Sequence, residues 1–103
     1  MYKIEFLPIA KEDMDNIIYY ISYNLKNITA SKNLRDLFIK SLNYIIEFPY
    51  SNSIYKPLRN LSYEYRIYKI KNFLMFYTIN EDKKLITIMR ILYQKMDISN
   101  ILE

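Results

Sequence analysis

The feature that most constrains the fold of this 103-residue chain is a change in the spacing of its apolar residues along the sequence. A short alternating run, "YKIEFLP", comes first and is predicted to be a strand that Pro8 ends. Apolar residues then recur at helical spacing in two successive segments. After an aperiodic stretch, three strand-like runs follow at Glu64–Ile70, Phe73–Ile79 and Leu85–Ile91. This succession predicts an α+β fold.

The two helical segments are predicted to form a hairpin, because a short connection joins them. The first begins after Pro8 with acidic residues in its first turns, where the helix dipole favours negative charge. The sequence "KNIT" interrupts the helical spacing, and Thr29 is the expected N-cap of the second helix, which runs to Phe48 and Pro49. The apolar stripes consist of Met14, Ile17, Ile18, Ile21 and Leu25 in the first helix and of Leu34, Leu37, Phe38, Leu42, Ile45 and Ile46 in the second.

The last three strands are predicted to form an antiparallel meander, since the turns between them are short. Lys71 and Asn72 make a two-residue hairpin connection, and "NEDKK" makes the next turn. The chain has no glycine, so we expect its asparagines to take the left-handed turn positions. Residues 49–63 are predicted to be a loop, and the final "MDISNILE" is compatible with a helical turn or a further strand.

The predicted order is therefore β-α-α-β-β-β in a single domain that spans residues 1–103. In this arrangement the helical hairpin packs on one face of a small antiparallel sheet, and the other face is left open.

The residue types that the chain lacks exclude several kinds of chemistry. Without cysteine it has no disulfides and no thiolate zinc ligands, and without histidine it lacks the commonest metal ligand and the usual general base. Without glycine it cannot carry a glycine-rich phosphate loop. We therefore expect no metal and no cofactor. Any catalysis must use Lys, Arg, Tyr, Asp, Glu, Ser or backbone groups.

The apolar runs and the N-terminus indicate a cytoplasmic protein with no membrane partner. No apolar run approaches the roughly 20 residues that span a bilayer. The N-terminal "MYKIEFLPIAKED" carries carboxylates where a signal peptide has an uninterrupted apolar region.

Positive charge is concentrated in the C-terminal half of the chain. Residues 1–55 hold six Lys or Arg and six Asp or Glu, whereas residues 56–103 hold nine against five. Tyrosines lie among these cations along the last three strands. Because aromatic rings stack on unpaired bases and Lys or Arg binds phosphate, this half is a candidate single-stranded RNA surface, with a merely solvated surface as the alternative. The candidate RNA-binding residues are Lys56, Arg59, Lys69 and Lys71.

Three segments together resemble the RelE/ParE superfamily of toxins from type II toxin–antitoxin modules. They are "YKIEFLPIAKEDMDNIIYYI", "YRIYKIKNFLMFYTI" and "ITIMRILYQKMDISNIL". The resemblance covers nearly the entire chain and lies in the order of the segments. A strand enters Pro-x-Ala and a helical hairpin, Tyr-Arg opens a later strand, an aromatic strand follows, and Arg-Ile-Leu-Tyr precedes a terminal Asp.

The resemblance implies a small basic toxin that a cognate antitoxin protein holds inactive. In the RelE branch the toxin enters the ribosome and cuts mRNA without a metal, through attack of the ribose 2′-oxygen on the adjacent phosphate. In the ParE branch a similar fold poisons DNA gyrase. We take ribosome-dependent mRNA cleavage as the leading expectation, gyrase poisoning as the alternative, and an inactive homologue that only binds antitoxin as the third.

A metal-free RNA cut requires a base, cations beside the phosphorane and an acid. By residue type and position in this resemblance, the predicted catalytic residues are Arg66 and Arg90 as phosphate clamps, Tyr93 for stacking or proton positioning, and Lys95. We also expect Lys95, Lys56 and Arg59 to act as base, acid or RNA-positioning groups, with Glu64 as an alternative base. A lysine can serve as base only where neighbouring cations or burial lower its pKa.

Each of these residues also has a structural interpretation. Arg66 is suited to ordering the sheet edge or the C-terminal tail, Arg90 to pairing with Asp97, and Tyr93 to closing the core. Histidine-bearing members of the superfamily carry a C-terminal histidine about where Tyr93 stands, so the resemblance leaves only a lysine, tyrosine and arginine style of cleavage.

Overall fold

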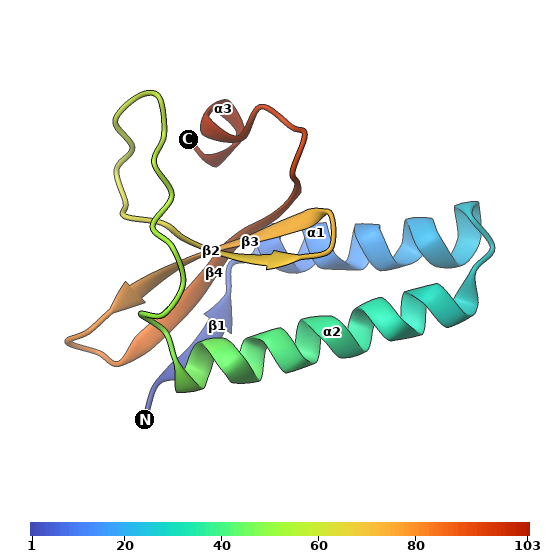
Figure 1. Cartoon of the computed structure of the whole chain (residues 1–103), viewed down its shortest axis with the longest axis horizontal. Coiled ribbons are helices and arrows are strands. Elements are labelled where there is room, and N and C mark those ends of the chain that lie inside the picture. Colours follow the sequence, from blue (N-terminus) through green and yellow to red (C-terminus); the bar gives the residue numbers. More distant parts are fainter.

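The computed structural model describes residues 1–103 and consists of a four-stranded sheet, a long helical hairpin and a short C-terminal helix (Figure 1). The α+β class and the predicted order β-α-α-β-β-β are confirmed, with a π-helical segment between the two long helices and a short helix added at the C-terminus. In chain order the elements are β1 (Lys3–Phe6), α1 (Pro8–Tyr19), the π-helical segment η1 (Tyr20–Asn24), α2 (Ile28–Glu47), β2 (Arg66–Ile70), β3 (Phe73–Asn80), β4 (Leu85–Tyr93) and α3 (Ile98–Leu102).

The sheet has the strand order β1-β4-β3-β2. The predicted antiparallel meander of β2, β3 and β4 is confirmed, but β1 pairs in parallel with β4, with Lys3 opposite Leu85 and Phe6 opposite Ile88. The sheet is therefore mixed. Two helices follow β1, so no tight turn forces it to run antiparallel to its neighbour in the sheet.

The helical hairpin covers one face of the sheet, as predicted. Leu34, Phe38 and Ile45 of α2 are buried in the same core as residues of β3 and β4, among them Met75 and Ile88. Asn27 is the N-cap of α2, because its side-chain oxygen accepts a hydrogen bond of 2.9 Å from the N–H of Ala30. The expectation that Thr29 caps this helix is wrong, since asparagine, a stronger capping residue than threonine, stands two residues earlier.

The second face of the sheet is not left open, and that expectation is wrong. A separate cluster of Tyr65, Phe76 and Leu92 is buried there beneath the 49–65 loop and α3, which contributes Ile98, Ile101 and Leu102. Alternation along β3 places Leu74 and Phe76 on this face, and such apolar side chains need a cover. The C-terminal segment is therefore a helix, docked over the second face.

Lysines, and not asparagines, occupy the left-handed backbone positions. Lys26, Lys71 and Lys84 have φ angles of 51°, 53° and 51°. The expectation for Asn72 is wrong because the preceding residue takes the turn. Nearby asparagines contribute acceptors instead, as Asn80 does when its side-chain oxygen accepts from the N–H of Lys83 at 3.0 Å.

Candidate functional site

Arg90 is held by a residue that sequence reasoning did not single out as a partner, Asp13 of α1. The Nε of Arg90 donates to Oδ2 of Asp13 at 2.8 Å, and an Nη donates to Oδ1 at 2.9 Å. The two side chains are only 19% and 15% exposed. This ion pair raises the pKa of Arg90 through the hydrogen bonds to Asp13. Arg90 pairs with Asp13, so the predicted pairing with Asp97 is wrong.

Asp13 also completes the free edge of β4. The pairing of β1 with β4 ends at Phe6 and Ile88, and the N–H of Ile91 then donates to Oδ2 of Asp13 at 3.0 Å. A register shift leaves Met89 as an extra residue opposite β3, because Phe76 pairs with Arg90 and Tyr77 with Ile88. Such a bulge changes the direction of the side chain that follows it, which here is Arg90.

Arg66 is engaged by the loop that covers the second face. Its Nη1 donates to the carbonyl oxygens of Asn52 at 2.8 Å and Tyr50 at 3.2 Å, and its guanidinium carbon lies 5.0 Å from the centre of the Tyr50 ring. Only 14% of its side chain is exposed. The structural interpretation of Arg66 is thus close to what is observed, since it orders the chain beside the sheet edge.

The two arginines lie on strands that flank β3. Arg66 pairs with Tyr77 and Arg90 with Phe76, so two strand spacings, about 10 Å, separate their backbones. Arg66 is bound by the 49–65 loop and Arg90 by α1. The contacts of the two guanidinium groups thus lead to different elements, and the pair does not form a common clamp in this arrangement.

Tyr93, Lys95 and Lys71 belong to two chain segments that lie side by side at one end of the sheet. The N–H of Gln94 donates to the carbonyl of Asn72 at 2.9 Å, which holds the end of β4 beside the β2–β3 turn. Tyr93 packs on Phe73 with ring centres 6.0 Å apart and is 39% exposed. Both lysines are exposed, and neither takes part in an ion pair. These three are the predicted site residues that are exposed on neighbouring segments.

The remaining candidates are spread over the 49–65 loop and β2. Lys56 and Lys69 are exposed, and an Nη of Arg59 donates to the carbonyl of Ser99 at 2.8 Å, which ties the loop to α3. Glu64, the alternative base, lies 4.0 Å from Arg66 and is 67% exposed. No acid–base pair suited to proton transfer is formed among them.

Sequence reasoning missed a cluster around Glu81 at the opposite end of the sheet. The hydroxyls of Tyr2 and Tyr50 each donate to Oε2 of Glu81 at 2.7 Å, and Lys84 pairs with Oε1. The hydrogen bonds from Lys84, Tyr50 and Tyr2 lower the pKa of Glu81 to about 2, and the bond to Glu81 raises the pKa of Tyr50 to about 12. The cluster joins the N-terminus, the loop and the β3–β4 turn. In the sequence only Glu81 and Lys84 are close to each other, because both belong to one short turn.

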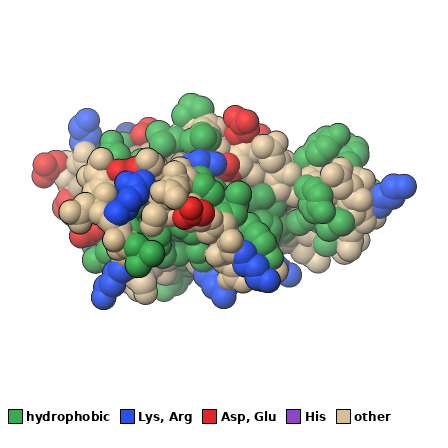
Figure 2. All heavy atoms as spheres, turned by 90° about the horizontal axis from the view of Figure 1, so that it is seen from above, with side chains coloured by type: hydrophobic (Ala, Val, Ile, Leu, Met, Phe, Trp, Pro, Cys, Tyr) green, Lys and Arg blue, Asp and Glu red, His purple; other side chains and the backbone are tan.

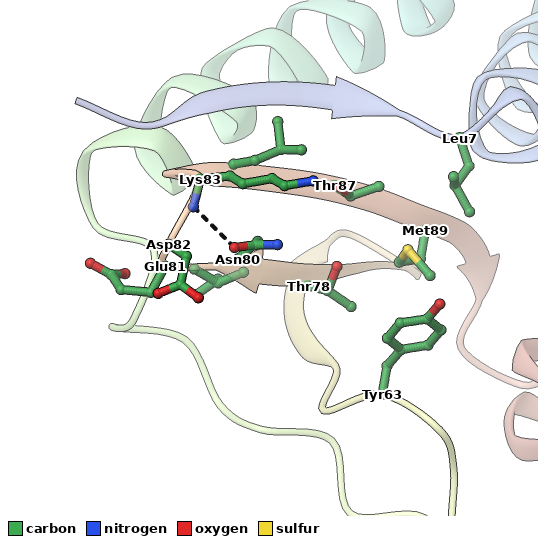
Figure 3. Close-up of a pocket in the computed structure, with 11 residues that line it drawn as sticks. Leu7, Tyr63, Thr78, Asn80, Glu81, Asp82, Lys83, Thr87 and Met89 are labelled. Carbon is green, nitrogen blue, oxygen red and sulfur yellow. Dashed lines mark hydrogen bonds between the residues drawn. The ribbon is translucent and has the colours of Figure 1, made fainter.

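A shallow hollow of about 530 Å³ lies on the part of the second face that α3 does not cover (Figure 3). Thr78, Thr87 and Met89 line it from the sheet, and Tyr63 faces them from the loop. The turn beside it carries Glu81 and Asp82 together with Lys83. None of the predicted catalytic or RNA-binding residues lines this hollow.

The profile of one family matches residues 4–98, and that family is described as the ParE toxin of the type II toxin–antitoxin system parDE. The chain belongs to the ParE toxin family. The match begins inside β1 and ends at the first residue of α3, so it covers the hairpin, β2 to β4 and most of β1. No curated protein matches the sequence.

Membership of this family makes the chain the toxin of a type II toxin–antitoxin module, with an antitoxin as its partner. No group of three or more His, Cys, Asp or Glu side chains in this toxin is placed to hold a metal ion. None of its helices combines the length and the apolar character needed to cross a membrane.

Proposed function

We propose that this ParE-family toxin stops growth by poisoning DNA gyrase. The match to the ParE toxin family carries the proposal. The resemblance implies that the ParE branch of the superfamily acts on gyrase. The family profile matches the chain from β1 to the start of α3, so the similarity extends over nearly the whole toxin fold.

The arrangement of the two arginines supports this choice over mRNA cleavage. A phosphate clamp must direct its positive groups at one position, where negative charge develops in the transition state. Arg90 is instead paired with Asp13, and Arg66 is bonded to two loop carbonyls. Releasing either arginine for RNA would break contacts that hold elements of the fold together.

Ribosome-dependent mRNA cleavage is the second candidate, and one observation favours it. Tyr93, Lys71 and Lys95 are exposed at the same end of the sheet, where an aromatic ring and two cations are free to meet a base and phosphates. In this mechanism Tyr93 stacks on or positions the RNA, and Lys95 serves as the base or acid, or positions the phosphate.

Induction of the toxin in a host cell separates the two mechanisms. Primer extension on a translated message and a gyrase supercoiling assay are run on the same cultures. Trapped gyrase–DNA complexes with intact mRNA are expected. New mRNA 5′ ends that depend on ribosomes, with normal gyrase activity, would overturn the proposal in favour of cleavage. Unimpaired growth would favour a chain that only binds antitoxin.

Variants at the exposed end of the sheet test the second candidate by residue. If the toxin cleaves RNA through these two residues, Tyr93→Phe and Lys95→Ala should reduce the ribosome-dependent mRNA 5′ ends. If it poisons gyrase without them, both variants should still trap gyrase–DNA complexes. Lys83→Ala, in the turn at the far end of the sheet, is the matched control for loss of one exposed charge.

A further inference from the structure

The strand β1 lies at an edge of the sheet, and its outer side carries free backbone groups. It comes first in the strand order β1-β4-β3-β2, and Figure 3 shows it as the outermost strand, next to the strand that carries Thr87. The N–H groups of Lys3 and Leu7 donate toward β4 at 2.8 and 3.0 Å. Because backbone groups alternate in direction along a strand, those of Ile4 and Phe6 point away from β4. No turn or loop bonds to the backbone of these two residues.

The opposite edge of the sheet has a partner within the chain. There β2 is covered at its start by the 49–65 loop, because Ile54 and Arg66 form an antiparallel bridge. The N–H of Ile67 donates to the carbonyl of Ser53 at 3.0 Å. An uncovered edge strand is the part of a sheet that pairs most readily with another chain. In this fold that strand is β1.

The exposed side chains of β1 carry opposite charges. Lys3 and Glu5 are both exposed, and neither takes part in an ion pair. They lie on the second face of the sheet, where Leu7, which follows in the same alternation, lines the hollow. Ile4 and Phe6 face the helical hairpin and pack against its core. Charged side chains usually protect an edge strand from pairing, but a lysine and a glutamate two residues apart are complementary to an antiparallel copy of the same strand.

One antiparallel register of β1 with a second copy satisfies both the charges and the backbone. When Ile4 lies opposite Ile4 of the copy, Lys3 lies opposite Glu5 at two symmetric positions. The outward backbone groups of Phe6 then face those of Tyr2, and the two Ile4 residues bond to each other. A shift by two residues places Lys3 opposite Lys3 or Glu5 opposite Glu5, and like charges in these positions are destabilising. A shift by one residue places outward backbone groups against inward ones.

We propose that β1 pairs with β1 of a second copy of the chain, antiparallel and centred on Ile4, so that the two sheets join into one continuous sheet. The two-fold axis makes each contact occur twice. Figure 2 looks onto the side that carries the 49–65 loop and α3, and it shows Lys and Arg interspersed with Asp and Glu, so no large region of one sign opposes a second copy there. Each copy contributes one short strand, so the dimer should be weak and depend on concentration.

Sedimentation equilibrium of the full toxin, separated from its co-expressed antitoxin, measures the Kd of the dimer. Lys3→Glu and Glu5→Lys each place like charges opposite one another at both symmetric positions. The double variant Lys3→Glu/Glu5→Lys exchanges the two charges and restores both pairs of opposite charge. Lys69→Glu is the matched control, because Lys69 is an exposed lysine of the other edge strand, β2, and its substitution changes the net charge equally.

We expect Kd to rise about tenfold or more for each single variant, and to stay within about threefold of wild type for the double variant and for Lys69→Glu. Added salt should narrow the difference between wild type and the single variants, because screening weakens both attraction and repulsion. Circular dichroism establishes that each variant is folded.

Amide hydrogen exchange locates the interface on the strand. The N–H groups of Ile4 and Phe6 should exchange more slowly as the toxin concentration rises through Kd, because only the bonds of the dimer protect them. The N–H groups of Lys3 and Leu7 are bonded within one chain and should be protected in the monomer as well.

A toxin that stays monomeric at its highest soluble concentration would overturn the inference. So would a dimer in which the single variants have the Kd of wild type, or in which the Ile4 and Phe6 amides exchange equally fast at every concentration, because that dimer uses another surface. Protection of these amides only after antitoxin is added would make the occupant a strand of the antitoxin. None of these measurements depends on toxicity, so the dimer and the gyrase proposal fail separately.

Discussion

The carboxylate of Asp13 accepts both guanidinium donors of Arg90 and the N–H of Ile91, with distances between 2.8 and 3.0 Å. Asp13 belongs to α1, whereas Arg90 and Ile91 lie on β4 beyond the end of its pairing with β1. One carboxylate thus continues the edge of the sheet and fixes the hairpin against it. Arg90, which the sequence suggested as a phosphate-binding residue, therefore joins β4 to α1 in the fold.

Removing either partner of this pair is expected to destabilise the toxin. Asp13→Ala leaves a mostly buried guanidinium and the Ile91 N–H without their acceptor, and we expect the free energy of unfolding to fall by about 3 kcal/mol. Arg90→Ala should cost less, about 2 kcal/mol, because Asp13 keeps its bond to Ile91. Urea denaturation measures both values.

Asp15→Ala is the control, because Asp15 is an exposed acid of the same helix with no hydrogen bond or ion pair. It should change stability by less than about 0.5 kcal/mol. Equal stability of Asp13→Ala and Asp15→Ala would contradict a structural role for the pair.

The elements that depend on local patterns were predictable from the sequence. The apolar stripes of α1 and α2 and the three strands of the meander follow from spacings of a few residues. The parallel pairing of β1 with β4 and the docking of α3 over Phe76 depend on contacts between distant segments, and no local spacing encodes them. The antiparallel sheet and the open face were therefore the parts of the predicted topology that needed correction, beside the local expectations for Thr29 and Asn72.

The candidate site was less predictable for the same reason. Asp13 and Arg90 are 77 residues apart in the chain, and in the sequence Asp13 has only the role of an acid near a helix N-terminus. Arg66 bonds to carbonyl groups of a loop without periodicity, and such bonds leave no signal in residue identity. The residue types identified the charged positions. Only the fold showed which cations are bonded within the protein, as Arg66 and Arg90 are, and which form no ion pair, as Lys71 and Lys95 do not.

The left-handed lysines predict a stabilising substitution at the tip of the hairpin. Lys26 has a φ of 51°, which a Cβ atom disfavours and glycine tolerates. Lys26→Gly should raise the free energy of unfolding by about 0.5–1 kcal/mol, since relief of the backbone conformation exceeds the added flexibility of the unfolded chain. Thermal unfolding should show a higher Tm.

Lys32→Gly provides the opposite case, because Lys32 is an exposed residue inside α2. There glycine should lower stability by about 1 kcal/mol. A lower Tm for both variants would mean that the conformation at Lys26 carries no strain.

Tyr77 is expected to anchor the 49–65 loop from beneath. Its buried hydroxyl donates to the carbonyl of Pro49 at 2.7 Å and accepts from Nδ2 of Asn52 at 3.1 Å. Tyr77→Phe leaves both groups without this partner and should cost about 1–2 kcal/mol. Limited proteolysis followed by mass spectrometry should show faster cleavage within the loop. Tyr23→Phe, which removes an exposed hydroxyl without a protein partner, should leave the cleavage rate unchanged.

The Glu81 cluster predicts how the stability of the toxin depends on pH. The bonds from Lys84, Tyr50 and Tyr2 lower the pKa of this carboxylate from 4.5 to about 2 in the folded chain. A lowered carboxylate pKa means that the unfolded chain binds the proton more readily, so the contribution is complete above about pH 4.5 and declines as the pH falls toward 2. The urea concentration at the unfolding midpoint, measured between pH 6 and 2, should therefore decrease as the pH is lowered from about 4.5 toward 2. In Glu81→Gln the acid-induced loss of stability should be smaller but not absent, because hydrogen bonds from Ser62 and Tyr65 also lower the pKa of Glu103.

Asp82→Asn in the same turn is the control for loss of an exposed charge. An acid-induced loss of the same size in Glu81→Gln and wild type would assign the pH dependence to other carboxylates.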